Sequence, residues 1–332
     1  MTSDELNVLI AQHGFQNVHA VKILLAIYRK GVTQLSQIAG IPKSLKELLL
    51  AGFSTGIYSP GKSERSVDNS VKFLFRNADG MEFETVYLPD NKRKTVCVST
   101  QAGCRMGCPF CLTGRYGFRG NLSAGDIINQ VISLPEAKWI THVVFMGMGE
   151  PMDNIEEVLK ACKILTSDWG LSISSRNITV STVGILPGIL EFLDRSQCNL
   201  TLSLHSPFPE ERRLVVPVEN KFPAHKIIDL MKSFPPGKKR RMSVAYVMIK
   251  DINDSDRHLQ ALKGLLADSP IRVNLLPYHR VPDDPNGPST GDKMQYFRHS
   301  LVMAGISASI RKSRGEDISA ACGLLASGLK IK

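Results

Sequence analysis

The stretch Cys97-Val-Ser-Thr-Gln-Ala-Gly-Cys-Arg-Met-Gly-Cys-Pro-Phe-Cys111 holds four of the chain's seven cysteines. Three of them, Cys104, Cys108 and Cys111, have the spacing C-x3-C-x2-C. Zinc usually takes four ligands in a tetrahedron, whereas three close thiolates without an evident fourth suit an iron–sulfur cluster with one open iron. The alternation from Thr95 to Ser99 predicts a strand, so the cysteines would follow its carboxyl end, where α/β sheets and barrels bind ligands. A zinc knuckle or three buried cysteines are the alternatives.

Composition restricts the class of protein. With 332 residues and 43% hydrophobic residues, the chain is long enough for one large and one small folded domain, and disorder is excluded. We see no signal peptide behind the acidic N-terminus, and no apolar run approaches the roughly 20 residues of a membrane span. An odd number of cysteines, clustered at one place, indicates a reducing compartment, and we expect a cytoplasmic protein.

The chain is strongly basic, with a net charge of +10 and a pI near 9.3. This charge favours a polyanionic partner, of which nucleic acid is the usual one, but it fits a soluble protein that is simply basic equally well. The densest cluster, Lys238-Lys-Arg-Arg241, follows Pro-Pro-Gly and is interpreted as a solvated loop rather than a phosphate contact.

Hydrophobic periodicity divides the chain into three parts. Residues 1–60 show helical spacing and form either an RNA-binding accessory module or a packing cap. Residues 61–93 contain a linker and a β-hairpin, with strands Ser70–Phe75 and Met81–Leu88 joined by an Asn77-Ala-Asp-Gly turn. Residues 94–332 alternate between strand and helix patterns.

Six strand–helix units follow one another in the third part. The predicted strands are Thr95–Ser99, Thr141–Met146, Asn177–Ser181, Asn199–His205, Met242–Ile249 and Ile271–Leu276. The predicted helices are Ser123–Leu134, Asn154–Thr166, Pro187–Leu193, Ala224–Ser233, Asp254–Ala267 and Gly291–Ala304. Six units predict a parallel sheet with right-handed crossovers, and because eight would be needed to close a barrel, an open partial (β/α)6 barrel fits best.

Polar motifs end several of these strands. Gly147-Met-Gly-Glu-Pro151 follows the second, Ser181-Thr182 ends the third, and Ser203-Leu-His205 ends the fourth. Side chains at the carboxyl ends of parallel strands converge on one cavity, and Glu150 can accept a hydrogen bond from an ammonium group. Cys322 lies in a small-residue loop that is long enough to reach the same mouth, whereas Cys162 and Cys198 are interpreted as inert core residues.

Together these segments resemble the RlmN/Cfr family of radical S-adenosylmethionine (SAM) RNA adenine methyltransferases. The resemblance rests on Cys97-Val-Ser-Thr-Gln-Ala-Gly-Cys104, Phe145-Met-Gly-Met-Gly-Glu-Pro151, Ser203-Leu-His-Ser-Pro207 and Arg314-Gly-Glu-Asp-Ile-Ser-Ala-Ala-Cys-Gly323. It covers about residues 84–323. It implies a radical SAM partial barrel, a [4Fe-4S] cluster held by Cys104, Cys108 and Cys111, and SAM on the open iron. The RlmN branch, which methylates adenine C2 in 23S rRNA and often in tRNA, is more similar than the C8-specific Cfr branch.

The resemblance also implies roles for residues outside the cluster motif. Cys322 would take a methyl group from one SAM, lose a hydrogen atom to a 5′-deoxyadenosyl radical made from a second SAM, and add its carbon to the electron-poor C2. Glu84 would accept the ring proton. Cys97 would then attack the sulfur of Cys322 and release methyladenine as a disulfide forms.

The SAM contacts implied by the resemblance are Gly149, Glu150, Ser181, Ser203, Leu204, His205 and His279. His279 stands where the family has an asparagine, and Leu324 stands where it has a glutamine. The implied partners are 23S rRNA, with tRNA as a further substrate, and an electron donor such as flavodoxin; we expect a monomer. Two other classes of protein stay open, namely another radical SAM enzyme, which would leave Cys97 and Cys322 without a role, and a zinc-binding RNA module.

Overall fold

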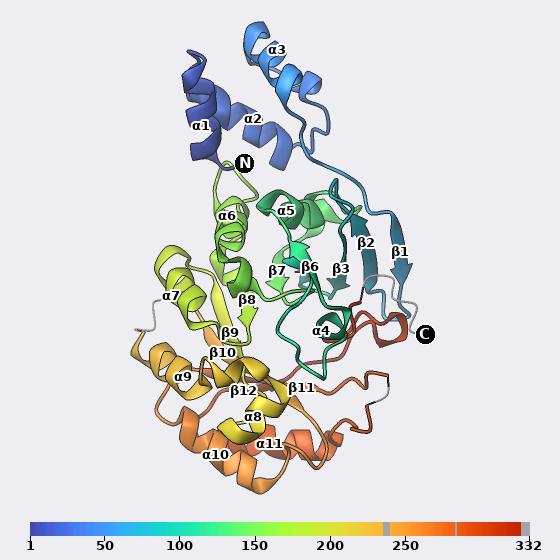
Figure 1. Ribbon diagram of the computed structural model, residues 1–332, viewed down its shortest axis with the longest axis vertical. Helices are drawn as coiled ribbons and strands as arrows, with labels where there is room; N and C mark the ends of the chain where they lie inside the picture. The colour runs from blue at the N-terminus through green and yellow to red at the C-terminus, as the bar shows by residue number, and fades with distance from the viewer. Residues whose placement is uncertain (235–239, 283, 327–332) are drawn as a thin grey trace.

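A ten-stranded sheet forms the centre of the computed structural model, which describes residues 1–234, 240–282 and 284–326 (Figure 1). In their order across the sheet, its strands are β1 (Lys62–Arg65), β2 (Val71–Arg76), β3 (Glu82–Pro89), β4 (Lys94–Val98), β7 (His142–Phe145), β8 (Ile178–Thr182), β9 (Asn199–Ser203), β10 (Met242–Met248), β11 (Arg272–Pro277) and β12 (Ala308–Ile310). Neighbours from β1 to β4 are antiparallel, and neighbours from β4 to β12 are parallel. The two ends of the sheet, β1 and β12, do not pair, so the predicted open partial barrel is confirmed.

Helices fill the crossovers between the parallel strands. They are α5 (Ala124–Ile132), α6 (Ile155–Thr166), α7 (Leu186–Arg195), α8 (Pro209–Val215), α9 (Ala224–Ser233), α10 (Asp256–Leu266) and α11 (Gly291–Met303). The six predicted strand–helix units are therefore all present, and the predicted bounds are within about two residues of the observed ones. Among the described residues, no helix has the length and apolar character needed to cross a membrane.

The short elements escaped prediction. They are α4 (Leu112–Tyr116), α8, β1, β12 and a two-stranded sheet of β5 (Gln101–Gly103) with β6 (Phe118–Asn121). Three to seven residues are too few to show a period. The predicted strand Asn199–His205 is also too long, because β9 ends at Ser203 and His205 has a φ of 60°, which no strand can continue.

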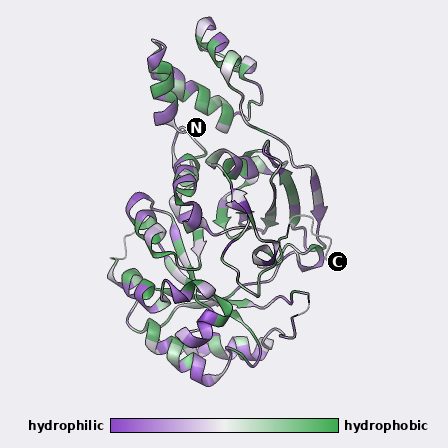
Figure 2. Ribbon diagram, in the orientation of Figure 1, coloured by the Kyte–Doolittle hydropathy of each residue, from purple (hydrophilic) through white to green (hydrophobic). Residues whose placement is uncertain are grey.

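The two faces of the parallel strands differ in chemistry. Val180, Leu202 and Tyr246 belong to the buried core beneath the helices, and Figure 2 shows apolar residues along the strands and polar ones on the outer helices. The opposite face carries hydroxyls: Thr201 Oγ1 lies 2.8 Å from Ser243 Oγ across neighbouring strands. Parallel sheets are usually apolar on both faces. A polar inner face therefore marks the inside of the barrel as the place for a ligand.

The N-terminal helices form a small unit with its own hydrophobic cluster. These are α1 (Ser3–Gln12), α2 (Val18–Tyr28) and α3 (Lys43–Gly52). Figure 1 shows them at one end of the molecule, above α5 and α6. Arg29 connects them to the barrel through a hydrogen bond to the carbonyl of Gly170 (3.2 Å), and Tyr28 packs on Trp169. The division of the chain at residues 60 and 93 stays a prediction, although β1–β3 continue the barrel sheet.

The basic run at residues 238–241 is only partly described, because Lys238 and Lys239 lie outside the described residues. Arg240 is not the solvated loop residue we expected. It is half-buried, donates to the carbonyl of Leu193 (3.0 Å), and packs over the rings of Phe192 and Phe234.

The C-terminal segment returns from β12 to the hairpin at the other end of the sheet (Figure 1). Asp68 binds this segment by accepting hydrogen bonds from Arg314 Nε (2.9 Å) and the Gly315 N–H (3.0 Å). Burial opposes ionisation of Asp68, but hydrogen bonds from Ser70 and Gly315 and the charge of Arg314 hold the pKa of this carboxyl below its ordinary value. The segment thus spans the opening that the unclosed sheet leaves.

Replacing Asp68 by asparagine is expected to loosen this segment. Losing a charged acceptor at a partly exposed site costs roughly 1 kcal/mol of local opening free energy, equivalent to about fivefold faster amide exchange. Hydrogen exchange read by mass spectrometry over residues 311–323 measures the effect. Asp79→Asn, at the exposed hairpin turn, is the control. Equal exchange in both variants would show that Asp68 does not hold the segment.

Candidate active site

The three cysteines of the predicted cluster motif lie on one loop between β5 and α4. The Cys104 N–H donates to the carbonyl of Gly117 (3.1 Å), and the Cys111 N–H donates to the carbonyl of Cys108 (3.1 Å). Cys111 is also the N-cap residue of α4. Cys108 is buried and the other two are half-buried. These backbone hydrogen bonds therefore fix the positions of Cys104 and Cys111 within the loop.

The thiols of this loop are close enough to perturb one another. Desolvation raises the pKa of Cys104 to about 12 and that of Cys108 well above its ordinary value, and the charge of Cys111 raises both further. Yet no group of three or more His, Cys, Asp or Glu within the described ranges is placed to hold a single metal ion. Three thiols on one loop are the ligands of an iron–sulfur cluster that keeps one iron open. The donor set fits the cluster.

The segment Gly147–Glu150 is hydrogen-bonded to the start of the cluster loop. The Thr100 N–H donates to the carbonyl of Met148 (2.8 Å), and the Glu150 N–H donates to Gln101 Oε1 (2.9 Å). Gly149 has a φ of 98°, and a Cβ there would lie 2.7 Å from the Gln101 backbone nitrogen. Close approach of two protein backbones therefore requires this glycine.

Glu150 bridges the ends of β7 and β8. Its carboxylate accepts hydrogen bonds from the N–H groups of Met152 (3.0 Å) and Val183 (2.9 Å). Complete burial raises its pKa to about 7, although these hydrogen bonds oppose the rise. Among the residues that the structure describes, no ion pair joins this carboxylate to a cation, so Glu150 suits the binding of an ammonium group.

The polar residues after β8 and β9 meet as predicted. Ser181 Oγ lies 3.4 Å from Ser203 Oγ. The ring centroids of His205 and of Phe110, a residue of the cluster loop, lie 5.0 Å apart in an edge-to-face arrangement. The Val247 N–H donates to His205 Nδ1 (3.1 Å), which makes this nitrogen an acceptor and leaves the proton on Nε2. Burial lowers the pKa of His205 to about 3, and the charge of Arg212 adds to this.

Sequence reasoning missed Arg212, whose guanidinium holds the ends of β8 and β9 in place. It donates to the carbonyls of Val183 (2.6 Å), Ser203 (2.8 Å) and Leu204 (2.9 Å), and it is paired with the buried carboxylate of Glu219. In Glu210-Glu-Arg-Arg213 it looks like one charge of a solvated helix. The only features of the sequence that could have indicated a buried arginine here are the Pro at the start of that helix and the apolar residues after it.

His279 contacts the C-terminal segment from the end of β11. Its Nε2 lies 3.2 Å from Ser313 Oγ, and its Nδ1 lies 3.3 Å from a carboxylate oxygen of Glu316. Burial lowers the pKa of His279 while Glu316 opposes the shift. The imidazole at this position therefore anchors the segment that carries Cys322, a role that its sequence position did not suggest.

Cys322 is held against the cluster loop by the residue that follows it. The Leu112 N–H donates to the carbonyl of Gly323 (2.7 Å). Gly323 has a φ of 84°, and a Cβ there would lie 3.2 Å from the carbonyl oxygen of Phe110. Only glycine fits this turn without displacing the loop, so the position of Cys322 is tied to that of Cys111.

Cys322 is held near the cluster loop by Gly323. As a whole residue it is exposed, although protein surrounds its thiol, while Cys97 on β4 is buried. Desolvation by the surrounding protein raises the pKa of Cys322, and the charge of Cys111 raises it further, with Arg311 opposing. Burial likewise raises the pKa of Cys97, with the charge of Cys322 as the next cause. Cys322 therefore lies within electrostatic range of both Cys97 and Cys111.

Glu84 is buried on β3, not exposed as its alternating strand would allow. Its carboxylate lies 3.5 Å from Lys72 Nζ and accepts a hydrogen bond from the Ala326 N–H (2.9 Å). Lys72 was missed by sequence reasoning. The signal was a lysine inside the apolar alternation Val71-Lys-Phe-Leu-Phe75, which sets it on the same face of the sheet as Glu84.

The neutral, buried imidazole of His205 makes stability depend on pH. The pKa of His205 is lower in the folded protein than in the unfolded chain. Its contribution to the free energy of unfolding is therefore complete above about pH 6.5 and is lost as the pH falls, by roughly 1.4 kcal/mol per pH unit. Chemical denaturation at pH 7.5 and 5.5 measures this. His205→Gln, whose side-chain oxygen can still accept from Val247, is expected to lose less stability on acidification than the unchanged protein. Equal losses would contradict a neutral His205.

Comparison with known proteins gives a consistent match. Residues 98–261 match the family model described as "Radical SAM superfamily", whose enzymes use a [4Fe-4S] cluster and SAM. The chain is 43% identical to a Parabacteroides distasonis protein named "Probable dual-specificity RNA methyltransferase RlmN", over 100% of this chain and 96% of that one. It is 37% identical to the "Dual-specificity RNA methyltransferase RlmN" of Desulfotalea psychrophila, over 98% and 93% of the two chains.

A solved structure agrees over nearly the same length. The crystal structure of a radical SAM methyltransferase from Sphaerobacter thermophilus superposes with a TM-score of 0.90 at 35% identity, and the match covers 98% of this chain and 97% of that one. The fold, the thiol loop and the full-length similarity thus agree, and the chain belongs to the RlmN family of radical SAM RNA methyltransferases.

Proposed function

We propose that this enzyme methylates C2 of an adenine in 23S rRNA, and in tRNA, with a carbon carried by Cys322. The supporting observation is the turn at Gly323, which holds the residue after Cys322 against the cluster loop, within electrostatic range of Cys111 and Cys97. The names of the relatives, which specify two RNA specificities, support the pair of substrates. We also propose that the enzyme is a cytoplasmic monomer and that it takes electrons from a donor such as flavodoxin.

Cys104, Cys108 and Cys111 would hold the cluster. Glu150, Gly149, Ser181, Ser203, Leu204 and His205 would surround SAM, with Glu150 accepting from its amino group. His279 would fix the position of the C-terminal segment and would also contact SAM. When bound, the cluster and SAM supply a carbon-centred radical that can remove a hydrogen atom from an S-methyl group.

The chain's own residues account for the remaining steps. The Cys322 thiolate takes a methyl group from SAM, and after losing one hydrogen its carbon adds to C2, which is too electron-poor to attack a methyl donor itself. The product of this addition is a radical. Glu84 takes its C2 proton, and its unpaired electron would return to the bound cluster, which supplies one electron when SAM is cleaved. Cys97 then attacks the sulfur of Cys322; the S–S bond forms, the S–C bond breaks, and the released carbon takes up a proton to become the methyl group.

RNA would bind through its backbone with the target adenine unstacked, because pairing within a duplex buries C2. The net charge of +10 supports this mode. Raising the salt concentration is therefore expected to weaken RNA binding steeply, which filter binding or fluorescence anisotropy would measure. Affinity that stays constant with salt would contradict binding through phosphates.

Two alanine variants separate the roles of the thiols. Cys322→Ala is expected to abolish methyl transfer to RNA while keeping the visible absorption of the cluster and the cleavage of SAM. Cys108→Ala, the matched control, is expected to lose all three. Transfer by the Cys322→Ala variant would contradict a protein-borne methyl group.

The position of the product tests the assignment of the site. Methylated adenines are mapped in 23S rRNA and tRNA from cells with and without this gene. Loss of 2-methyladenine on deletion supports the proposal. Loss of 8-methyladenine alone would move the enzyme to the C8-specific branch, and no change in either RNA would refute RNA methylation at adenine.

A further inference from the structure

The part of the chain that carries the cluster loop has charges of one sign only. Residues 91–125 include six lysines and arginines and no aspartate or glutamate. Three of these cations, Arg105, Arg115 and Arg119, lie on the cluster loop and on the helix and strand that follow it, and all three are exposed. An arginine side chain keeps its charge throughout the neutral pH range. This segment therefore adds only positive charge to the surface beside the three thiols.

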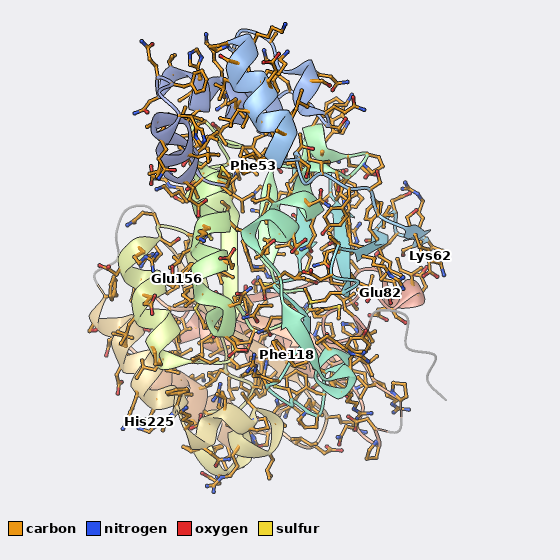
Figure 3. All side chains as sticks on the ribbon, turned by 45° about the horizontal axis from the view of Figure 1, so that its top comes forward. Phe53, Lys62, Glu82, Phe118, Glu156 and His225 are labelled. Atoms are coloured by element: carbon orange, nitrogen blue, oxygen red, sulfur yellow. The ribbon has the colours of Figure 1, made fainter. Side chains whose placement is uncertain are left out.

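Two of these arginines lie on aromatic rings. The guanidinium carbon of Arg105 is 3.8 Å from the centroid of the Phe118 ring, and that of Arg119 is 4.8 Å from the centroid of the Tyr116 ring. Phe118 is still 37% exposed, and the side chain of Arg105 is 50% exposed. Figure 3 labels Phe118 at the start of β6, close to α4. We call these four side chains the arginine–aromatic platform.

Backbone contacts and an ion pair hold the platform in place. Gly103 has a φ of 79°, and a Cβ there would overlap the carbonyl oxygen of Gly117, so the strands of the β5–β6 sheet lie in close contact. Arg105 Nε lies 2.8 Å from a carboxylate oxygen of Asp153. A surface that is already ordered loses little conformational entropy when a partner binds to it.

Support of the cluster loop explains only part of this arrangement. It accounts for Arg105, because the ion pair with Asp153 fixes the residue that follows the first cluster cysteine. It does not account for Arg115 and Arg119, to which the described residues offer no carboxylate. Arg115 donates to backbone carbonyls, among them that of Pro282 (2.7 Å), and Arg119 lies on its ring. Exposed guanidiniums beside exposed rings suit a partner that has both negative charge and planar groups.

The platform lies one short helix away from the segment that carries Cys322. α4 has five residues and therefore spans about 7.5 Å between its N-cap, Cys111, and its C-cap, Gly117. At the first of these ends, the Leu112 N–H donates to the carbonyl of Gly323 (2.7 Å). A few nucleotides of extended RNA can therefore contact the platform while one base reaches Cys322.

We propose that the platform binds the single-stranded RNA beside the target adenine. A neighbouring base stacks on the Arg105–Phe118 pair, and Arg115 and Arg119 bind the flanking phosphates. This inference rests on the proposed function and extends it by naming the surface that holds the RNA. Unstacked bases are bound in proteins on aromatic rings and guanidinium planes, and arginine forms paired hydrogen bonds with phosphate oxygens.

The stacking is tested with RNA fragments that carry 2-aminopurine on either side of the target adenine, bound to the reconstituted enzyme without SAM. Stacking quenches the fluorescence of 2-aminopurine. Phe118→Leu keeps an apolar side chain but removes the plane, so it is expected to bind RNA roughly tenfold more weakly and to lose the quenching. Phe118→Tyr keeps the plane and is expected to retain both the affinity and the quenching.

The phosphate contact is tested through the salt dependence of binding. Arg119→Gln is expected to lower the slope of log affinity against log salt concentration by about 0.7, the value for one phosphate of a single strand. The matched control is Tyr296→Leu on α11, which removes an exposed ring that lies 5.5 Å from Lys293 Nζ. This control is expected to leave the affinity, the quenching and the salt slope unchanged.

The visible absorption of the cluster shows whether each variant is folded. If Phe118→Leu does not hold its cluster, the salt slope of Arg119→Gln decides the matter, because the described residues offer the Arg119 side chain no hydrogen bond that its loss would break. Unchanged affinity and quenching in a folded Phe118→Leu would overturn the proposal. So would slower reduction of the cluster by an acidic electron-transfer protein with RNA binding unchanged, which would assign the platform to the electron donor.

The two proposals can fail separately. If the unchanged enzyme neither binds nor methylates RNA, the proposed function fails. If it methylates RNA at adenine while Phe118→Leu and Arg119→Gln bind RNA as the unchanged enzyme does, only the role of the platform is refuted.

Discussion

The contact between the Gly323 turn and the loop that follows Cys108 is the constraint on which the site depends. Gly323 reaches the carbonyl of Phe110 and the N–H of Leu112 because it has no side chain and accepts a φ of 84°. Without that contact, Cys322 would be one exposed thiol near the end of the chain. With it, Cys322 is held against the cluster loop, within electrostatic range of Cys111 and Cys97.

The rest of the fold supports this contact from both ends of an open sheet. Because β1 and β12 do not pair, the C-terminal segment can cross the gap, where Asp68 holds Arg314 and His279 holds Ser313. A closed barrel would leave no such path into its mouth. The polar inner face, the buried Glu150 and the guanidinium of Arg212 then shape the barrel side of the same opening, each with hydrogen bonds that offset the cost of burying it.

Much of this could be predicted from the sequence. The strand–helix alternation gave the partial barrel, since six periodic units of ordinary length are hard to confuse with another fold. The thiol spacing indicated the cluster loop. What escaped prediction has two physical causes. Short elements such as β12 show no period. Tertiary partners also cannot be derived from the local sequence: the alternation around Lys72 gives its face of the strand but not its contact with Glu84, and Arg212 looks like a solvated charge although it binds the carbonyls of Val183 and Leu204.

The origin of the transferred carbon can be measured directly with SAM whose methyl group carries three deuterium atoms. If Cys322 holds the methyl group and loses one of its hydrogens before the carbon reaches the ring, the methyl group on adenine retains two of the three deuterium atoms, as mass spectrometry of the digested RNA would show. A product that keeps all three would mean direct transfer from SAM to the base, and Cys322 would then have no part in carrying the carbon.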